Sequence, residues 1–398
     1  MSRRVVILSL IFSPDNVSTA QIMAGLSEDL KKAGDEVSVV TTTPHFHRDP
    51  SMEASQPIQW FIWPFLKKSD YRGVRVYHVP MPDKSIWPPL RLLSWIWFHI
   101  VSTLVCWSFG RIDALIACTP PMTIGLSAWA VKAIKRCKVV FNVQEVYPDI
   151  AINLGYMKNK RIIAFFKWLE KFIYRKSDAV TTITDGMRDK ILGRTDPAKV
   201  RLIPNYVEFG EDEEKVEPLA PHKAFTVTYA GNMGVPQNLG PLVDMARKLG
   251  SGVKVLFVGD GGDRKRLQEL ADGLDNVEFR GYRPISEMPS IYAESDVLYV
   301  GQDEKAASDG IPSKIYRILG NRKPLVIIAP MDGDLARFIK DSGGGRMASA
   351  ETLPEVIEDM RKADLKAMAE RGYAYVRDNY SRGKVTGMYV KLMEELVK

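Results

Sequence analysis

The start of one helix in the second half of the chain carries residues that could hold a phosphate group. A helix is expected to open at Pro312 and Ser313, with Ser313 as its cap and Lys314 in its first turn. Unpaired backbone N–H groups and the helix dipole attract anions there, and Lys314 adds a full positive charge. We therefore predict that Pro312, Ser313 and Lys314 contact a nucleotide diphosphate. The alternative is an ordinary helix start with a surface lysine.

A glycine-containing loop provides a second possible phosphate contact. Gly231, Asn232 and Gly234 directly follow a β-rich run at residues 225–229, and glycine lets the backbone approach a phosphate closely. A tight turn that needs glycine would explain the same residues. The chain has neither the GxGxxG dinucleotide fingerprint nor a P-loop, which argues against a dehydrogenase or a nucleotide hydrolase.

Carboxylates follow a buried strand in the first half of the chain. Gln144 and Glu145, and then Pro148 and Asp149, come just after the strand expected at residues 138–143, where ligands bind in open α/β sheets. Glu145 could orient or deprotonate an acceptor hydroxyl group. A hydrogen-bonding role between domains is the alternative.

Two histidines, His45 and His47, follow the second expected strand. No third ligand lies at a useful spacing, so we predict no metal site and expect acceptor contacts or surface residues.

Alternating strands and helices must position these residues. A chain of 398 residues suits two α/β domains of roughly 150–200 residues each. The alternation predicts two Rossmann-like domains with parallel sheets covered on both faces. We place the domains at residues 1–207 and 222–374, joined by the polar stretch 208–221, with a C-terminal helix at about 375–398 packing back on the first domain. The expected strands are 5–10, 36–41, 74–79, 114–117, 138–143, 179–184, 225–229, 253–258, 277–279, 297–300 and 325–328, and the expected helices of the first domain are 20–33, 90–109, 123–135 and 160–175.

The distribution of charge and the number of cysteines indicate which partners and which cellular compartment the protein suits. Residues 1–210 carry 28 Lys and Arg against 18 Asp and Glu, a net charge of +10, whereas the remainder carries 27 against 30, a net charge of −3. The basic half could face an anionic membrane or substrate, and no nucleic-acid motif is present. Three cysteines without metal-ligand spacing suggest a reducing cytoplasm.

Apolar and aromatic segments are concentrated in the same basic half. Residues 92–109 form an apolar run at the lower length limit of a membrane span, but strands expected on both sides favour a buried or interfacial helix. Residues 60–66, 87–89 and 160–176 mix aromatic with basic side chains, as membrane-surface elements do. Aromatic core positions with solvated basic rims are the alternative.

Six short blocks along the chain resemble the family 4 glycosyltransferases of GT-B fold, in which two Rossmann-like domains face each other across a cleft. The resemblance is strongest to the L-fucosamine transferase-like subgroup of bacterial surface-polysaccharide assembly. The blocks are FNVQEVYPD at 141–149, SDAVTTIT at 177–184, IPNY at 203–206, YAGNMG at 229–234, VGDGG at 258–262 and PSKIY at 312–316.

The resemblance implies further donor-site residues in the second domain. The family's hallmark is a pair of acidic residues eight positions apart, and Asp309 and Arg317 occupy those positions. Asp309 can accept a hydrogen bond from a sugar hydroxyl, whereas Arg317 cannot replace a carboxylate on the ribose because arginine only donates. The subgroup also places a glutamine at Gln237, and Tyr282 lies where the family holds the base.

The implied activity is a metal-independent, anomer-retaining sugar transfer without a cofactor. The donor would be a nucleotide-sugar, with UDP as the expected nucleotide, and the acceptor a lipid-linked glycan or polysaccharide at the cytoplasmic face of the membrane. A UDP-sugar 2-epimerase and a non-catalytic GT-B partner subunit are the alternatives, the latter because of Arg317.

Overall fold

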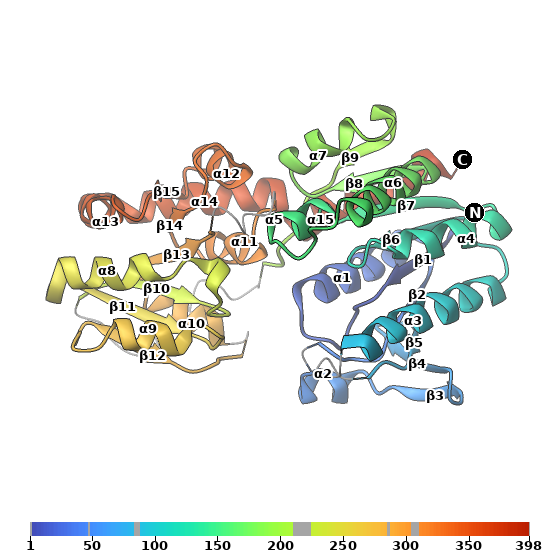
Figure 1. The fold of residues 1–398 in the computed structure, drawn as a ribbon, viewed down its shortest axis with the longest axis horizontal. Coiled ribbons are helices and arrows are strands. Elements are labelled where there is room, and N and C mark those ends of the chain that lie inside the picture. The colour runs from blue at the N-terminus through green and yellow to red at the C-terminus, as the bar shows by residue number, and fades with distance from the viewer. Residues whose placement is uncertain are drawn as a thin grey trace. The chain divides into compact units, whose positions relative to one another are not determined.

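The chain folds into two compact units, each built around its own sheet (Figure 1). The structure is a computed structural model that describes residues 2–46, 48–82, 88–209, 224–284, 287–303 and 310–397, without the side chains of residues 88 and 89. Unit 1 comprises residues 1–205 and 382–398, and unit 2 comprises residues 206–381. Most of the connection expected at 208–221 lies outside the described residues.

Unit 1 contains a mainly parallel sheet whose central strands are apolar and buried on both faces. Strands of this kind need helices on both sides of the sheet. In sheet order the strands are β3 (Gln59–Ile62), β4 (Leu66–Tyr71), β5 (Val74–Val79), β2 (Glu36–Thr42), β1 (Arg4–Ser9), β6 (Ala114–Cys118), β7 (Lys138–Val143), β8 (Ala179–Thr182) and β9 (Val200–Leu202).

The expected parallel sheet is confirmed, and at one edge it is extended by a hairpin in which β3 pairs antiparallel with β4, and β4 antiparallel with β5. The turn between β4 and β5 explains this, because Arg72 and Gly73 both have positive φ values, 50° and 78°. Asp70 accepts a hydrogen bond from the Gly73 N–H at 2.6 Å. Two successive residues of positive φ form the type of turn that joins antiparallel strands.

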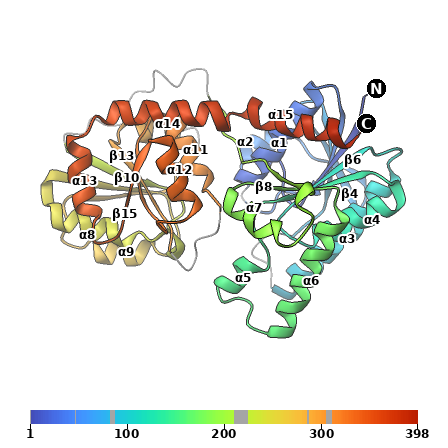
Figure 2. The same cartoon turned by 90° about the horizontal axis from the view of Figure 1, so that it is seen from above.

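Helices cover both faces of this sheet (Figure 2). Helices α3, α4 and α6 pack next to one another on one face, and α1 and α15 pack together on the other. The helices of unit 1 are α1 (Ser18–Lys32), α2 (Pro50–Ser55), α3 (Pro88–Ser108), α4 (Ile124–Lys135), α5 (Asp149–Asn153), α6 (Lys160–Lys176), α7 (Asp185–Leu192) and α15 (Arg382–Leu396).

The C-terminal helix α15 is fixed to unit 1 by polar contacts. Arg382 donates to Asp29 at 2.8 Å and to Glu28 at 2.7 Å. Burial acts to raise the pKa of Glu28, but hydrogen bonds from Arg382 and Lys32 hold it at about 2. The Tyr389 hydroxyl accepts from the Asn142 amide at 2.7 Å inside the unit.

The chain passes from unit 2 to unit 1 at Arg382. Of the segment 375–398 expected to pack on the first domain, residues 375–381 therefore belong to unit 2.

Unit 2 contains an all-parallel sheet. In sheet order its strands are β12 (Val277–Arg280), β11 (Val253–Val258), β10 (Phe225–Ala230), β13 (Val297–Gly301), β14 (Leu325–Ile328) and β15 (Gly345–Ala348). The helices are α8 (Gly240–Leu249), α9 (Arg264–Leu270), α10 (Met288–Ala293), α11 (Ser313–Gly320), α12 (Asp334–Ser342), α13 (Leu353–Lys362) and α14 (Leu365–Tyr380), with a 3-10 turn η2 (Val235–Gln237).

The strand order of unit 2 reverses between β10 and β13. The chain proceeds from β10 to β11 on one side, and from β13 to β14 on the other. Open α/β sheets bind ligands outside the carboxyl ends of the strands at such a switch point. The loop after β10 and the segment leading into α11 therefore border the expected site.

Candidate functional site

The first turn of α11 points backbone N–H groups toward this switch point. Pro312 is the residue that caps the helix, and no side chain forms a capping hydrogen bond. The prediction that Ser313 is the cap is therefore wrong. Pro312 has φ −57° and ψ 127°, an extended conformation that lies outside the helix, so Ser313 becomes its first residue. The N–H groups of this turn can donate to an external acceptor, such as a phosphate oxygen.

Lys314 lies at the centre of the site. Its Nζ is 4.3 Å from the centroid of the Tyr229 ring, at the end of β10. A Cβ placed on Gly231 would lie 3.8 Å from the same nitrogen, so the ammonium group reaches the loop after β10. No carboxylate among the described residues pairs with Lys314. Burial lowers the pKa of Lys314 to about 8.

This environment favours an anionic ligand. A half-buried ammonium group without a carboxylate partner has lost part of its hydration. Tyr229 compensates only in part, because a cation over an aromatic ring gains about 0.5–2 kcal/mol. A phosphate next to Lys314 would restore the missing interaction and raise its pKa.

The glycines of the neighbouring loops are explained by contacts between two loops. Gly259 has φ 131°, and a side chain there would overlap the carbonyl oxygen of Gly231. Hydrogen bonds join the loops, from the Gly231 N–H to the Val258 carbonyl at 2.9 Å and from the Met233 N–H to the Asp260 carbonyl at 2.7 Å. Gly231 itself has φ 142°, and a Cβ there would meet only side-chain atoms, at 3.5 Å or more. The loop after β11 thus supports the loop after β10 from behind.

The remaining residues predicted for this loop hold its shape. Gln237 accepts a hydrogen bond from the Gly234 N–H at 3.1 Å, which gives the glutamine a structural role. The Asn232 carbonyl accepts from the Tyr229 hydroxyl at 2.5 Å, while the Asn232 side chain is exposed. Gly231 is therefore the predicted loop residue that the structure places near the Lys314 ammonium group.

The structure describes two of the three other predicted donor-site residues, Tyr282 and Arg317. Tyr282 follows β12 at the same edge of the sheet and is 60% exposed. Arg317 lies one turn beyond Lys314 and is half-buried. It is close enough to Tyr292 to act on that hydroxyl: burial raises the pKa of Tyr292, and the charge of Arg317 lowers it. Asp309 lies outside the described residues, as does His47 of unit 1.

In unit 1, Glu145 follows β7 at the carboxyl edge of the sheet. The residue is exposed by its accessible surface, yet desolvation by the surrounding atoms raises the pKa of its carboxyl group. No described residue forms a hydrogen bond or an ion pair with its carboxylate. A carboxylate of raised pKa is suited to proton transfer, which fits the predicted role toward an acceptor hydroxyl.

The neighbours of Glu145 are already occupied. Gln144 donates to Asn142 at 2.7 Å and accepts from Asn205 at 2.8 Å. Asp149 forms an ion pair with Arg194. These contacts fix the loop, and they engage Gln144 and Asp149 but not the carboxylate of Glu145.

His45 is not a surface residue. It is 7% exposed, its N–H donates to Asp15 at 3.0 Å, and its Nδ1 lies 3.1 Å from the Thr42 hydroxyl. The expectation of a surface residue failed because this loop folds back over the end of β2. The described residues contain no group of three or more His, Cys, Asp or Glu that could hold a metal ion.

Sequence reasoning missed Tyr229 and the supporting role of Gly259. Tyr229 ends a buried strand beside the glycine loop, and its position there was the available signal. The contact of Gly259 with Gly231 joins two segments nearly 30 residues apart, which a local pattern does not reveal.

Two α/β units with candidate site residues at the carboxyl edges of their sheets have the GT-B fold, and solved structures share it. A sucrose-phosphate synthase from Thermosynechococcus elongatus aligns with a TM-score of 0.75 and 14% identity over 99% of this chain and 99% of that chain. HepE from Anabaena, in complex with UDP, aligns with a TM-score of 0.69 and 12% identity over 98% of this chain and 100% of that chain.

Sequence comparisons support a glycosyltransferase of this type. Residues 19–206 match the family model of the glycosyl transferase 4-like domain. The probable glycosyltransferase WbjE of Pseudomonas aeruginosa is 22% identical over 290 residues, which cover 68% of this chain and 72% of that protein. These matches favour neither a 2-epimerase nor a non-catalytic subunit.

Proposed function

We propose that this protein transfers a sugar from a UDP-linked donor to a lipid-linked or polysaccharide acceptor in cell-surface glycan biosynthesis, with retention of the anomeric configuration. The observation that carries the proposal is the Lys314 ammonium group, half-buried beside Gly231 and the first turn of α11 at the switch point. The UDP-bound HepE structure, which shares the fold, supports UDP as the donor nucleotide. The PSKIY block supports the L-fucosamine transferase-like subgroup.

The chemistry follows from where charge develops. As the bond between sugar and diphosphate breaks, negative charge grows on the leaving group, and Lys314 with the N–H groups of α11 stabilises it. Asp309 holds a donor-sugar hydroxyl, and Arg317 contacts a phosphate in place of the ribose carboxylate. Glu145 orients the acceptor hydroxyl in unit 1. Residues 1–207 thus serve the acceptor, and residues 222–374 serve the donor.

A panel of UDP- and GDP-sugars incubated with the purified protein and a membrane extract tests this function. We expect nucleotide release with at least one UDP-sugar and with no GDP-sugar. Asp309→Ala should lower turnover at least tenfold with nearly unchanged UDP affinity, because Asp309 contacts the sugar and not the nucleotide. Absence of release with every donor, from a protein that still binds UDP, would favour the non-catalytic subunit.

We further propose that the protein works as a peripheral protein at the inner face of the cell membrane. Helix α3 has a mean hydropathy of 1.4 over residues 90–108, and only 28% of this stretch is buried. It connects β5 to β6 along the chain and packs against β2 and β5 of unit 1, and its opposite face is exposed. Helix α6 adds exposed Phe165 and Trp168 beside its basic residues.

Vesicle co-sedimentation tests this second proposal. The protein should bind anionic vesicles at least tenfold more strongly than neutral ones and dissociate in high salt, because its basic residues are attracted to anionic head groups. Trp168→Glu should weaken the binding, since a charge would enter the contact face of α6. Met331→Glu changes an apolar residue of unit 2 that is at least as exposed as Trp168, and should have no effect. Equal, negligible binding to both vesicle types would contradict membrane association.

A further inference from the structure

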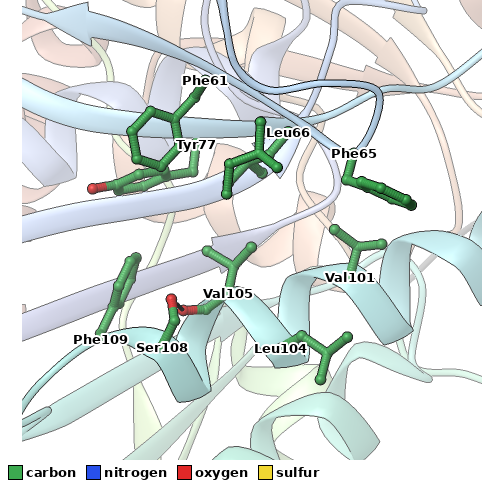
Figure 3. A pocket seen from close by; sticks show the side chains of 10 residues that line it. Phe61, Phe65, Leu66, Tyr77, Val101, Leu104, Val105, Ser108 and Phe109 are labelled. Carbon is green, nitrogen blue, oxygen red and sulfur yellow. Dashed lines mark hydrogen bonds between the residues drawn. The ribbon is translucent and has the colours of Figure 1, made fainter.

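An apolar groove lies between α3 and the hairpin formed by β3 and β4 (Figure 3). Its volume is about 430 Å³. Phe61, Leu66 and Tyr77 border it from the strands, and Val101 and Val105 border it from the helix. The full lining consists of Phe61, Ile62, Phe65, Leu66, Tyr77, Val101, Leu104, Val105, Ser108 and Phe109.

The lining suits a hydrocarbon and not a polar ligand. It contains no charged side chain, and its side-chain oxygens belong to Tyr77 and Ser108. The Ser108 hydroxyl already donates to the Val105 carbonyl at 2.7 Å. Water needs two to four polar partners to stay in a cavity, so this groove gains more from an apolar occupant.

A positive charge stands at the border of the groove. The Lys68 Nζ lies 5.0 Å from the centroid of the Phe61 ring, and Phe61 lines the groove. No carboxylate among the described residues pairs with Lys68. Because side chains alternate along a strand, Lys67 points to the opposite face of the sheet from Lys68. Its Nζ lies 4.5 Å from the centroid of the Trp60 ring, which does not line the groove. The groove therefore combines an apolar interior with a positively charged border.

The surroundings of the groove indicate where such a ligand comes from. Exposed Trp63 and Phe65 at the hairpin tip, and Trp97 and Ile100 on α3, continue its apolar surface to the outside. Phe65 and Trp97 have their ring centroids 5.7 Å apart, which joins the hairpin to the helix. A water-soluble substrate gains nothing from this surface, whereas a lipid would pass along it from a membrane.

The hairpin tip lies at the functional edge of the sheet. Lys67 pairs with His78, so Leu66 and the tip lie beside the carboxyl end of β5. β5 is parallel to β2 and therefore ends at the same edge of the sheet as β7, which precedes Glu145. One end of the groove thus opens at the edge where the acceptor is expected.

We propose that this groove binds the hydrocarbon chain of the acceptor lipid and that Lys68 contacts its phosphate group. The inference rests on the proposed lipid-linked acceptor and assigns its lipid part to residues of unit 1. The substrate class is a single hydrocarbon chain attached to an anionic phosphate head.

Alkyl phosphates of six to twelve carbons, titrated by calorimetry below their micelle concentrations, provide the test. Affinity should rise roughly fourfold per methylene until the groove is filled, and then level off. Inorganic phosphate should not compete, because the hydrocarbon chain of the alkyl phosphate supplies most of the binding free energy. Affinity independent of chain length would overturn the proposal.

Substitutions at two matched serines of α3 distinguish binding in the groove from adsorption to the surface of the helix. Ser108 and Ser94 form the same type of hydrogen bond, to the carbonyl three residues earlier, at 2.7 and 2.8 Å, and only Ser108 lines the groove. Ser108→Trp should fill the groove and weaken dodecyl phosphate binding at least tenfold, whereas Ser94→Trp should change it less than twofold. Equal losses in both variants would indicate adsorption to the whole helix face and overturn the groove.

The lysine pair tests the head group. Lys68→Gln should weaken dodecyl phosphate binding about tenfold and leave dodecyl maltoside binding unchanged, while Lys67→Gln should affect neither. Equal effects of the two substitutions would remove Lys68 from the site.

UDP titration of the same proteins keeps the two proposals apart. A wild-type protein that binds UDP but no alkyl phosphate would overturn the groove alone. One that binds alkyl phosphate but no nucleotide would overturn the proposed transfer and leave the groove as a lipid site.

Discussion

Replacing Lys314 with Met should weaken UDP binding roughly ten- to hundredfold. A charge-assisted hydrogen bond contributes about 1.5–3 kcal/mol, and Lys314 has no carboxylate partner among the described residues to compete for its charge. Methionine keeps the length and apolar contacts of the side chain over Tyr229 and removes only the charge. Calorimetry with UDP at pH 7 measures the change directly.

Uridine and a second lysine are the controls for this prediction. Uridine lacks the diphosphate, so its weaker binding should be the same in wild type and Lys314→Met. Lys340→Met removes an exposed lysine of α12, away from the switch point, and should leave UDP affinity within twofold. An unchanged UDP dissociation constant in Lys314→Met would remove Lys314 from the site.

Substituting Gly259 with Ala should destabilise unit 2 by about 2–6 kcal/mol and abolish tight UDP binding. Its φ of 131° is a conformation that L side chains rarely adopt, and the new Cβ would overlap the Gly231 carbonyl oxygen. Backbone strain costs roughly 1–3 kcal/mol, and the overlap adds roughly 1–3 kcal/mol. The loop after β10 would have to move, and Gly231 would move with it away from Lys314.

The positions of the tryptophans allow the unfolding of unit 1 to be distinguished from that of unit 2. All eight tryptophans lie between residues 60 and 168, so their fluorescence follows unit 1 during denaturation. Circular dichroism follows both units. Gly259→Ala should shift the unfolding transition seen by circular dichroism and leave the fluorescence transition in place.

Gly262→Ala is the matched control for the glycine prediction. A Cβ placed on Gly262 would meet no atom within 4 Å, and the residue has no positive φ, so its substitution should change stability by less than about 0.5 kcal/mol. Equal behaviour of the two variants would mean that the loops after β10 and β11 do not depend on each other.

The sequence was sufficient for most of the parallel sheet. The strands β5, β7, β11 and β14 have the predicted bounds. β7, β11 and β14 are short, mostly apolar runs buried in the sheet, whereas β5 begins with buried valines that alternate with less buried residues. The hairpin of β3 and β4 was missed. Its residues combine exposed aromatics with lysines, which is not the pattern of a buried strand. The turn that follows it depends on a positive φ at Arg72, which an arginine does not predict.

The site was predicted at the level of its segments and not of its contacts. Lys314 and Gly231 could be named because helix starts and glycine loops attract phosphate wherever they occur. Their proximity depends on the strand order of unit 2, which brings β10 next to β13. Two local features were also missed: Gln237 accepts a hydrogen bond from the Gly234 N–H three residues away, and the backbone conformation of Pro312 makes it, and not Ser313, the cap of the helix.

The pH dependence of UDP affinity tests the central role of Lys314 most directly. With a pKa of about 8, Lys314 is charged below pH 7 and loses its proton as the pH rises, while a bound diphosphate favours the charged form. Since the phosphates of UDP are largely ionised at pH 7, wild-type affinity should be highest near pH 7 and fall by up to tenfold per pH unit above pH 8. Lys314→Arg should bind UDP with no such fall, because the guanidinium group stays charged throughout. A wild-type affinity that stays flat to pH 9, or an equal fall in Lys314→Arg, would contradict a diphosphate site at Lys314.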